Sequence, residues 1–399
     1  MPTNNAGAIP ERVVNLDEAR LRHGAKADHM AEMVMGADPL ADAVITELDE
    51  LGKEGRRILN AGLAEGLERL GEEPPKAIKA LLEQLETVPS WVDPAMLDRG
   101  EAVAHSVPPV WFRIAVITTT LSHTYSSPAI ARTLVQTGQL TKMAPRRLIE
   151  TGMWVGSINQ PGGLHRGAPG YVATAQVRLL HARVRATALK HGWDPAVWGV
   201  PIGQVDTART WLDFTLINSR ATSAIGIVYS LEEQQKRYAY WSYVAYLLGL
   251  DPSFYEDVTD DESAGRLLDL LDSTSAPPDD NSRALTAAMI DATAQVLAAA
   301  PDALMDEEQY RDLTHGVLRL TLGSEHAGHL GVPESAAGHL LPLIGLLNGQ
   351  ARRWQTFTPE SAAAAIEENV SGGLSPELVE FLVPGGTAYA NTIRESVPG

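Results

Sequence analysis

Residues 171–192 read YVATAQVRLLHARVRATALKHG and predict one long helix that ends at Gly192, a typical helix stop. Apolar residues recur along it at the helical period: Val177, Leu180, Val184 and Ala188. His181 lies directly beside this apolar stripe. The stretch therefore predicts an amphipathic helix that presents an imidazole to an apolar interior.

Helix signals recur on both sides of this stretch. Asp38-Pro39 and Asp93-Pro94 are typical helix starts, with Asp as the cap and Pro in the first turn. Further helices are expected at about 75–85, from Pro128 onward, and at 145–156, 204–229, 231–250, 261–272, 281–299, 305–322 and 334–354. The apolar, β-branched run at 110–125 fits a helix or a strand, and we favour a buried helix. We expect an all-α fold in a single large helical domain.

Composition suggests three segments within this fold. Residues 1–27 are polar and predict a mobile N-terminal arm. Residues 28–355 carry the periodic apolar spacing of the helical domain, and residues 356–399 form a C-terminal segment. The start of the chain lacks a basic stretch followed by an apolar one, and no run approaches the length of a membrane span, so we expect a cytoplasmic protein without stable membrane insertion.

Charge and cysteine content exclude several functions. The formal net charge is −18, which disfavours a nucleic-acid surface because phosphate binding needs an excess of Lys and Arg. The chain has no cysteine, which excludes thiolate-ligated haem, iron–sulfur clusters and a Cys nucleophile. Residues 102–149 contain no Asp or Glu, although five Lys and Arg residues fall there. This stretch fits either a pair of buried helices or a pocket for an anionic group.

His181 is the first candidate functional residue. Arg178 and Arg185 lie three residues before it and four after it, so they flank it along the helix. A neutral imidazole in an apolar pocket is the usual axial ligand of haem, and arginine suits the haem propionates. The alternative is a core histidine bonded to a carbonyl, and spacing alone favours that alternative.

Two residues on the preceding helix form a second candidate group. Arg147 and Thr151 are four residues apart and share a face. Together they could hold a cofactor carboxylate, although the spacing alone favours a surface arginine and a helix-facing threonine.

The remaining histidines are weaker candidates. His165 lies in the Gly/Pro loop NQPGGLHRGAPG at 159–170, from which it could reach a haem edge as a catalytic residue. His326 and His329 share a helical face, but a metal site needs three or four ligands. His105 and His123 could line a distal pocket, and a role in the core is the simpler interpretation.

The runs VRLLHARVR (177–185) and WDPAVWGVPIGQVDTARTWLDF (193–214) resemble the latex-clearing-protein/MpaB oxygenase family, and the likeness extends over about residues 91–250. In that family a helical histidine ligates haem b, and an Arg–Thr pair precedes it by 34 and 30 residues. Arg147 and Thr151 stand at those distances from His181. The resemblance implies a globin-like helical core with extra helices, which binds haem b and its iron through His181.

The resemblance also implies the chemistry, with two departures. Rubber-cleaving members carry a Glu where this chain has Ala131, and a Lys where it has Glu150. We therefore expect a haem-dependent oxygenase or oxidase that uses dioxygen or peroxide for a tailoring oxidation of a small hydrophobic or aromatic substrate, and not for rubber cleavage. Thr151 and His165 are the expected catalytic residues, and Arg147, Thr151, Arg178, Arg185 and His181 the expected cofactor-binding residues. A haem carrier or sensor without turnover is the alternative function, and the sequence leaves the oligomeric state open.

Overall fold

The computed structural model describes residues 9–71, 73–136, 140–300, 303–371, 383 and 385–394. All regular structure in these ranges is helical, and they contain no strand. The all-α prediction is confirmed.

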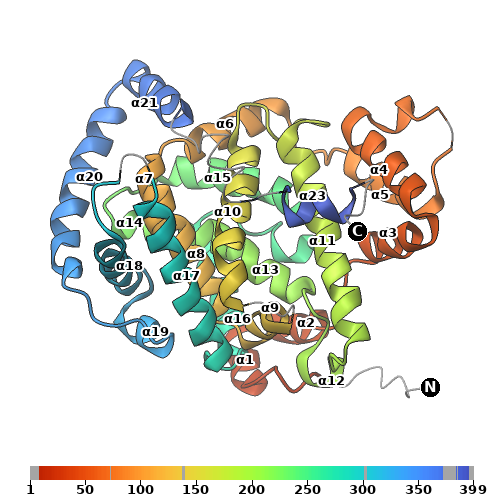
Figure 1. Ribbon diagram of the computed structural model, residues 1–399, viewed down its shortest axis with the longest axis horizontal. Helices are drawn as coiled ribbons and strands as arrows, with labels where there is room; N and C mark the ends of the chain where they lie inside the picture. The colour runs from red at the N-terminus through yellow and green to blue at the C-terminus, as the bar shows by residue number, and fades with distance from the viewer. Residues whose placement is uncertain are drawn as a thin grey trace.

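The first group of helices begins the chain. Its members are α1 (Leu16–His23), α2 (Ala25–Met33), α3 (Pro39–Leu51), α4 (Lys53–Glu65), the 3₁₀ turn η1 (Leu67–Arg69) and α5 (Lys76–Glu86). Asp38 caps α3 by accepting a hydrogen bond from the Ala41 backbone N–H at 3.2 Å. Helices α3 to α5 form the right-hand end in Figure 1. The predicted boundary at residue 28 falls inside α2, and residues 1–8 of the predicted arm lie outside the described ranges.

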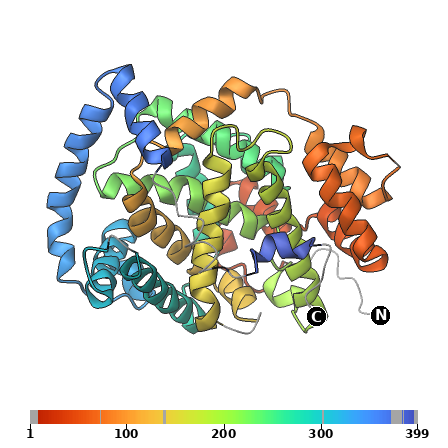
Figure 2. The same cartoon turned by 45° about the horizontal axis from the view of Figure 1, so that its top comes forward.

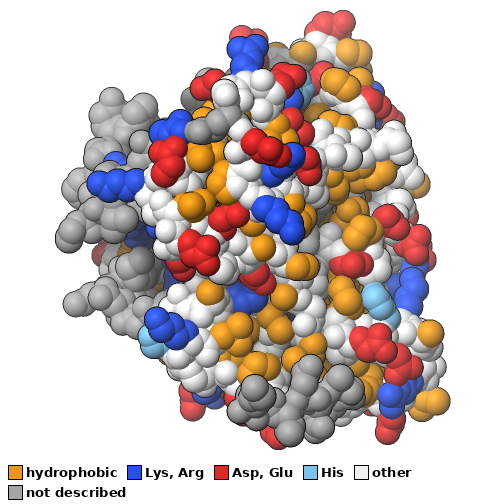
Figure 3. Space-filling view, turned by 90° about the vertical axis from the view of Figure 1, so that its right-hand side faces the viewer, with side chains coloured by type: hydrophobic (Ala, Val, Ile, Leu, Met, Phe, Trp, Pro, Cys, Tyr) orange, Lys and Arg blue, Asp and Glu red, His pale blue; other side chains and the backbone are white. Residues whose placement is uncertain are grey.

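The face at this end mixes charges of both signs. Figure 3 shows acidic and basic side chains alternating across it between apolar ones. Arg166 illustrates the pairing, because it contacts Glu68 at 3.1 Å and Glu86 at 3.2 Å. Because charges of opposite sign are paired there, this face has no large area of one sign of charge.

The second group supplies the centre of the fold. Its members are α6 (Pro94–Ala104), α7 (Pro109–Trp111), the π-helical η2 (Phe112–Ile117), α8 (Thr118–Tyr125), α9 (Pro128–Gln136), α10 (Leu140–Asn159) and α11 (Pro169–Lys190). The run at 110–125 is therefore helical throughout, as favoured. Every residue of α8 is buried, and its threonine hydroxyls find partners inside and outside the helix: Thr124 donates to the Thr120 carbonyl at 3.0 Å, and Thr120 to the Asp213 carbonyl at 3.3 Å. The described part of the acid-free stretch thus includes a buried core helix.

The third group packs around this centre. Its members are α12 (Pro195–Trp198), α13 (Gln204–Leu212), the π-helical η3 (Asp213–Ile217), α14 (Asn218–Ala224), α15 (Leu231–Leu247), the 3₁₀ turn η4 (Pro252–Phe254), α16 (Asp261–Ser273) and α17 (Asp280–Ala298). The expected helix at 204–229 contains a π turn and ends five residues early. The Asp213 carboxylate is bonded there by His123 at 2.6 Å and by Thr124 at 2.6 Å, so a buried polar group fixes the irregular turn.

The last group of helices runs along the edge opposite α3 to α5, and its final helix lies at the centre of the fold. Its members are α18 (Glu307–Leu322), α19 (Ser324–His329), the 3₁₀ turn η5 (Ala337–Leu340), α20 (Leu341–Gln355), α21 (Pro359–Ser371) and α23 (Ala388–Thr392). Helices α20 and α21 form the outer left edge in both ribbon views, whereas α23 lies against α10 and α11 (Figures 1 and 2). Of the predicted C-terminal segment, residues 372–382, 384 and 395–399 lie outside the described ranges.

A short strap ties the beginning of the chain to the rest. The Glu11 and Arg12 backbone N–H groups donate to the Ala196 and Val197 carbonyls at 3.0 and 2.9 Å, and the Val14 N–H donates to the Thr274 carbonyl at 3.0 Å. The strap therefore joins α12 to the end of α16.

Candidate functional site

His181 projects from the middle of α11 on a stripe that the rest of the protein covers incompletely. The apolar neighbours Val177, Leu180 and Val184 are half-buried, like His181 itself, whereas Ala188 is buried. The His181 imidazole makes no hydrogen bond within the described part of the chain, unlike most histidines that are satisfied in a core. Among the described residues, His181 therefore has no hydrogen-bond partner for its ring nitrogens.

The His181 imidazole is held in its neutral form. Burial lowers its pKa from the usual 6.5 to about 4; the Arg185 guanidinium also lowers it, and Asp38 opposes the shift. At neutral pH one of the two ring nitrogens therefore keeps a free lone pair, and this nitrogen is the one that can bind a metal ion.

One buried ion pair and one partly buried ion pair fix α11 on either side of His181. The Arg178 guanidinium contacts the Asp38 carboxylate at 2.6 and 2.9 Å, and the Arg185 Nε contacts Asp42 at 2.8 Å. Arg178 also donates to Gln84 at 2.6 Å and Arg185 to the Ile202 carbonyl at 2.6 Å. Both guanidinium groups thus bind carboxylates of α3, and they set the position of the helix that carries His181.

The packing of α10 on α11 places Arg147 opposite His181. The two helices run in opposite directions (Figure 1), and the Trp154 indole N–H donates to the Thr174 hydroxyl at 3.1 Å. Seven residues are two turns of helix, so Arg147 (154 − 7) and His181 (174 + 7) lie at one level on the two facing sides. Thr151 lies one turn nearer to Trp154. The predicted Arg–Thr pair and the predicted histidine therefore belong to one helix pair.

The side chains of Arg147 and Thr151 are half-buried. The Arg147 guanidinium donates to the Leu134 carbonyl at 3.4 Å, a long and weak contact. The Thr151 hydroxyl makes no hydrogen bond within the residues that the structure describes. A cation, a hydroxyl and an imidazole, each half-buried, thus lie on the two helices of this pair.

The sequence did not predict α23, the short helix that docks on α10 and α11. Glu150 is buried between Arg146, at 2.8 Å, and the Ala388 backbone N–H at the start of α23, at 2.7 Å. Helix α23 packs on α11, and Tyr389 is buried there. The cap residue Thr387 marks the start of α23, but no local signal shows where so short a helix docks.

The structure separates His165 from the helix pair. Its imidazole is exposed in the loop before α11, and its nearest charged partner is Asp98 at 4.0 Å. Twelve residues of helix separate Pro169 from His181, which is about 18 Å along the axis. His165 therefore lies near the N-terminal end of α11, away from the level of His181.

The other histidines pack within the fold. His105 contacts the Asn159 carbonyl at 2.5 Å, and His123 contacts Asp213 at 2.6 Å. The His326 ring stacks on His123 with the centroids 5.5 Å apart, and burial, with His123 next in effect, lowers the pKa of His326 to about 4. Among the described residues no group of three or more His, Asp or Glu side chains is arranged to hold a metal ion.

Comparison with solved structures supports the fold. The chain is similar to a structure of latex clearing protein in the closed state, with a TM-score of 0.62 and 20% sequence identity over 86% of this chain and 92% of that one. At this identity the likeness concerns the fold alone. No curated protein matches the sequence.

The family follows from a model match over residues 104–353, which include α10 and α11, whereas α3 and α23, which also pack on α11, lie outside the matched residues. The matching family is described as the catalytic domain of ER-bound oxygenase mpaB/B' and rubber oxygenase. The chain belongs to this oxygenase family, as the sequence predicted. No helix in the described ranges is both long and apolar enough to span a membrane.

Proposed function

We propose that this chain is a haem b-dependent oxygenase or oxidase in which His181 binds the iron. The observation that carries the proposal is the state of His181: neutral, without a hydrogen-bond partner in the described residues, and set in a partly covered apolar stripe. A neutral imidazole on an apolar wall is a typical proximal haem ligand. Bound haem would supply the chemistry by which dioxygen or peroxide oxidises the substrate.

The residues around His181 fit the other needs of a haem. Arg147 faces it across the helix pair, so we assign the contact with a propionate to its guanidinium. Thr151 has an unused hydroxyl one turn away, which can donate a hydrogen bond near the haem. Arg178 and Arg185 already bind Asp38 and Asp42, so we assign them the positioning of α11. The exposed His165 lies outside this group.

We propose a small hydrophobic or aromatic substrate and a tailoring oxidation, and not the cleavage of rubber. Ala131 stands where rubber-cleaving relatives carry a glutamate, and it is completely buried. Glu150, the nearest carboxylate on α10, is bonded to Arg146 and to the start of α23. Neither position offers a carboxylate that is free to act as a base.

The absorption spectra of haem-supplied wild type and of His181→Ala, each with a pyridine haemochrome assay, test the cofactor. We expect a Soret band in the wild type and its loss or shift in the variant. His165→Ala is the matched control, because this histidine is exposed and remote, and its spectrum should equal that of the wild type. A wild type without a Soret band, or an unchanged band in His181→Ala, would overturn the proposed ligand.

A further inference from the structure

Helix α20 exposes six large apolar side chains along one side. The helix forms the outer left edge of the molecule in Figures 1 and 2. Spacings of three, four and seven residues place these side chains together on one side of the helix and its two ends. The set consists of Leu340, Leu343, Leu346 and Leu347, which are 58–60% exposed, Trp354, which is 72% exposed, and Phe357, which is 76% exposed. We call this set the leucine face.

Small and polar residues hold the other side of α20 on the protein. Gly345 approaches Gly226 so closely that a Cβ atom on Gly226 would lie 1.9 Å from the Gly345 carbonyl oxygen. Asn348 donates a hydrogen bond to the Ile225 carbonyl at 2.8 Å and accepts one from the Trp111 indole at 3.0 Å. A helix on the surface of a protein usually buries its apolar side and exposes its polar side. These contacts fix the reverse orientation, so the leucine face is open to a partner outside the chain.

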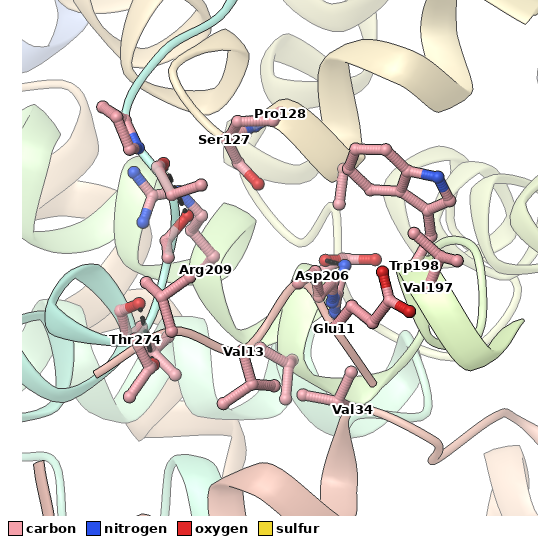
Figure 4. A pocket seen from close by; sticks show the side chains of 18 of the residues that line it. Glu11, Val13, Val34, Ser127, Pro128, Val197, Trp198, Asp206, Arg209 and Thr274 are labelled. Atoms are coloured by element: carbon pink, nitrogen blue, oxygen red, sulfur yellow. Dashed lines mark hydrogen bonds and ion pairs between the residues drawn. The ribbon is translucent and has the colours of Figure 1, made fainter. Parts of the chain in front are cut away.

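Apolar side chains near the N-terminal strap show the more usual arrangement. Val13, Val34 and Trp198 line a cavity of about 540 Å³ between the strap, α12 and α13 (Figure 4), so they face a space within the fold. A single exposed leucine, such as Leu21 on α1, is also normal on a protein surface. Six large apolar side chains on one side of a helix form a patch, and such patches mark contact sites.

The charges along α20 fit a partner that carries phosphate groups. One residue in eight of the chain is Asp or Glu (50 of 399), yet residues 335–359 contain none. Arg353 is exposed and makes no hydrogen bond or ion pair within the described residues. It follows Leu346 by two turns and precedes Phe357 by one, so it borders the leucine face. A guanidinium group without a carboxylate partner can bind a phosphate through two parallel hydrogen bonds.

These charges favour a phospholipid bilayer over a second copy of the chain. In a two-fold dimer the leucine face would meet itself, and residues 335–359 offer Arg353 no carboxylate. A bilayer supplies acyl chains for the leucines and phosphates for Arg353, and tryptophans such as Trp354 favour the level of the lipid headgroups. Acidic groups elsewhere on the chain oppose this contact little, because charges more than about 8 Å away are largely screened at physiological ionic strength.

We propose that α20 docks this protein on the surface of a phospholipid bilayer. Leu343 and Leu347 enter the apolar boundary of the acyl chains, Trp354 lies among the headgroups, and Arg353 binds a lipid phosphate. The helix lies along the surface and does not cross it, because α20 has 15 residues and a membrane-spanning helix needs about 20. The docking does not depend on bound haem, so its test is independent of the proposed oxygenase function.

Co-sedimentation of the full chain with vesicles of phosphatidylcholine and phosphatidylglycerol measures the partition onto the bilayer. We expect the wild type to bind and the double variant Leu343→Ser/Leu347→Ser to bind about tenfold or more weakly, because it loses two apolar side chains that the bilayer would bury. Both leucines are exposed, so the unfolding temperature should not change. Leu21→Ser removes an exposed leucine of α1 and should bind like the wild type. A wild type that stays in solution, or equal binding by the double variant, would overturn the proposal.

Two further measurements distinguish the bilayer from other partners. Arg353→Gln should bind these vesicles about fivefold more weakly, the effect of one arginine at an anionic surface, whereas Arg266→Gln on α16 should bind like the wild type. Equal binding by Arg353→Gln would remove the phosphate contact from the proposal. Light scattering without lipid measures the oligomeric state, and a dimer that dissociates in the double leucine variant would identify the leucine face as a subunit interface and overturn the docking on a bilayer.

Discussion

The indole of Trp154 and the hydroxyl of Thr174 are joined by a hydrogen bond of 3.1 Å, which marks the register of α10 on α11. The Thr174 hydroxyl accepts this bond and in turn donates one to the Gly170 carbonyl at 2.7 Å. The Trp154 ring also packs edge-on against Phe214 and Trp241. Two turns away, the same register brings Arg147 and His181 to one level.

Replacing Trp154 by Phe should therefore weaken the register. We expect the free energy of unfolding to fall by about 1 kcal/mol or more, because the variant loses the donor and part of the ring contacts. Chemical denaturation measures the change. Trp354→Phe on the exposed part of α20 is the control and should be nearly neutral; an equal loss in both variants would contradict a special role for Trp154.

The buried pair of Arg178 and Asp38 should dominate the attachment of α11 to α3. Arg178→Met leaves the Asp38 carboxylate buried without its partner, so we expect a loss of about 3–5 kcal/mol in unfolding free energy. The exposed pair of Arg266 and Glu262 is the control, where Arg266→Met should cost less than about 1 kcal/mol. Similar losses in the two variants would show that Arg178 does not anchor the helix.

The stack of His326 on His123 predicts a dependence of stability on pH. The pKa of His326 falls from the usual 6.5 to about 4 in the fold, so between these values the unfolded chain binds a proton that the folded chain does not. Stability is therefore retained above pH 6.5 and lost as the pH falls towards 4, by up to about 1.4 kcal/mol per pH unit. Denaturation of wild type and His326→Gln at pH 7 and 5 checks this; the variant should lose less, and an equal loss would contradict the prediction.

The Glu150 carboxylate should hold α23 in place. Glu150→Gln weakens the hydrogen bond to the Ala388 N–H and the ion pair with Arg146, so we expect faster amide hydrogen exchange at residues 387–394. Exposed Glu367→Gln on α21 is the control. Unchanged exchange in Glu150→Gln would show that the burial of Tyr389 and Ile393 suffices to dock the helix.

The sequence was most informative where a pattern is local. The cap at Asp38, the Pro starts and the period of α11 predicted those helices because each depends on neighbours within one or two turns. The π turn at Asp213 was missed because it depends on His123, ninety residues away, and α23 because its position depends on Glu150. Both are tertiary contacts that no local period encodes.

In the candidate site, too, local spacing predicted some features, whereas contacts between distant parts of the chain were not predicted. Spacing predicted that Arg178 and Arg185 flank His181 along one helix, and all three residues lie on α11. It could not show that Asp38 and Asp42 on α3 bind both arginines, because those carboxylates are about 140 residues earlier in the chain. The roles proposed for His181, Arg147 and Thr151 remain predictions.

The strap at the beginning of the chain has a consequence for synthesis on the ribosome. Val14 pairs with Thr274, which is made 260 residues later (274 − 14). At typical rates of elongation the nascent strap waits for this partner on the order of 10 to 50 s. During that time the Val14 backbone lacks its partner at the end of α16, so chaperones that hold short apolar segments can bind there, and the strap is complete only once α16 has emerged.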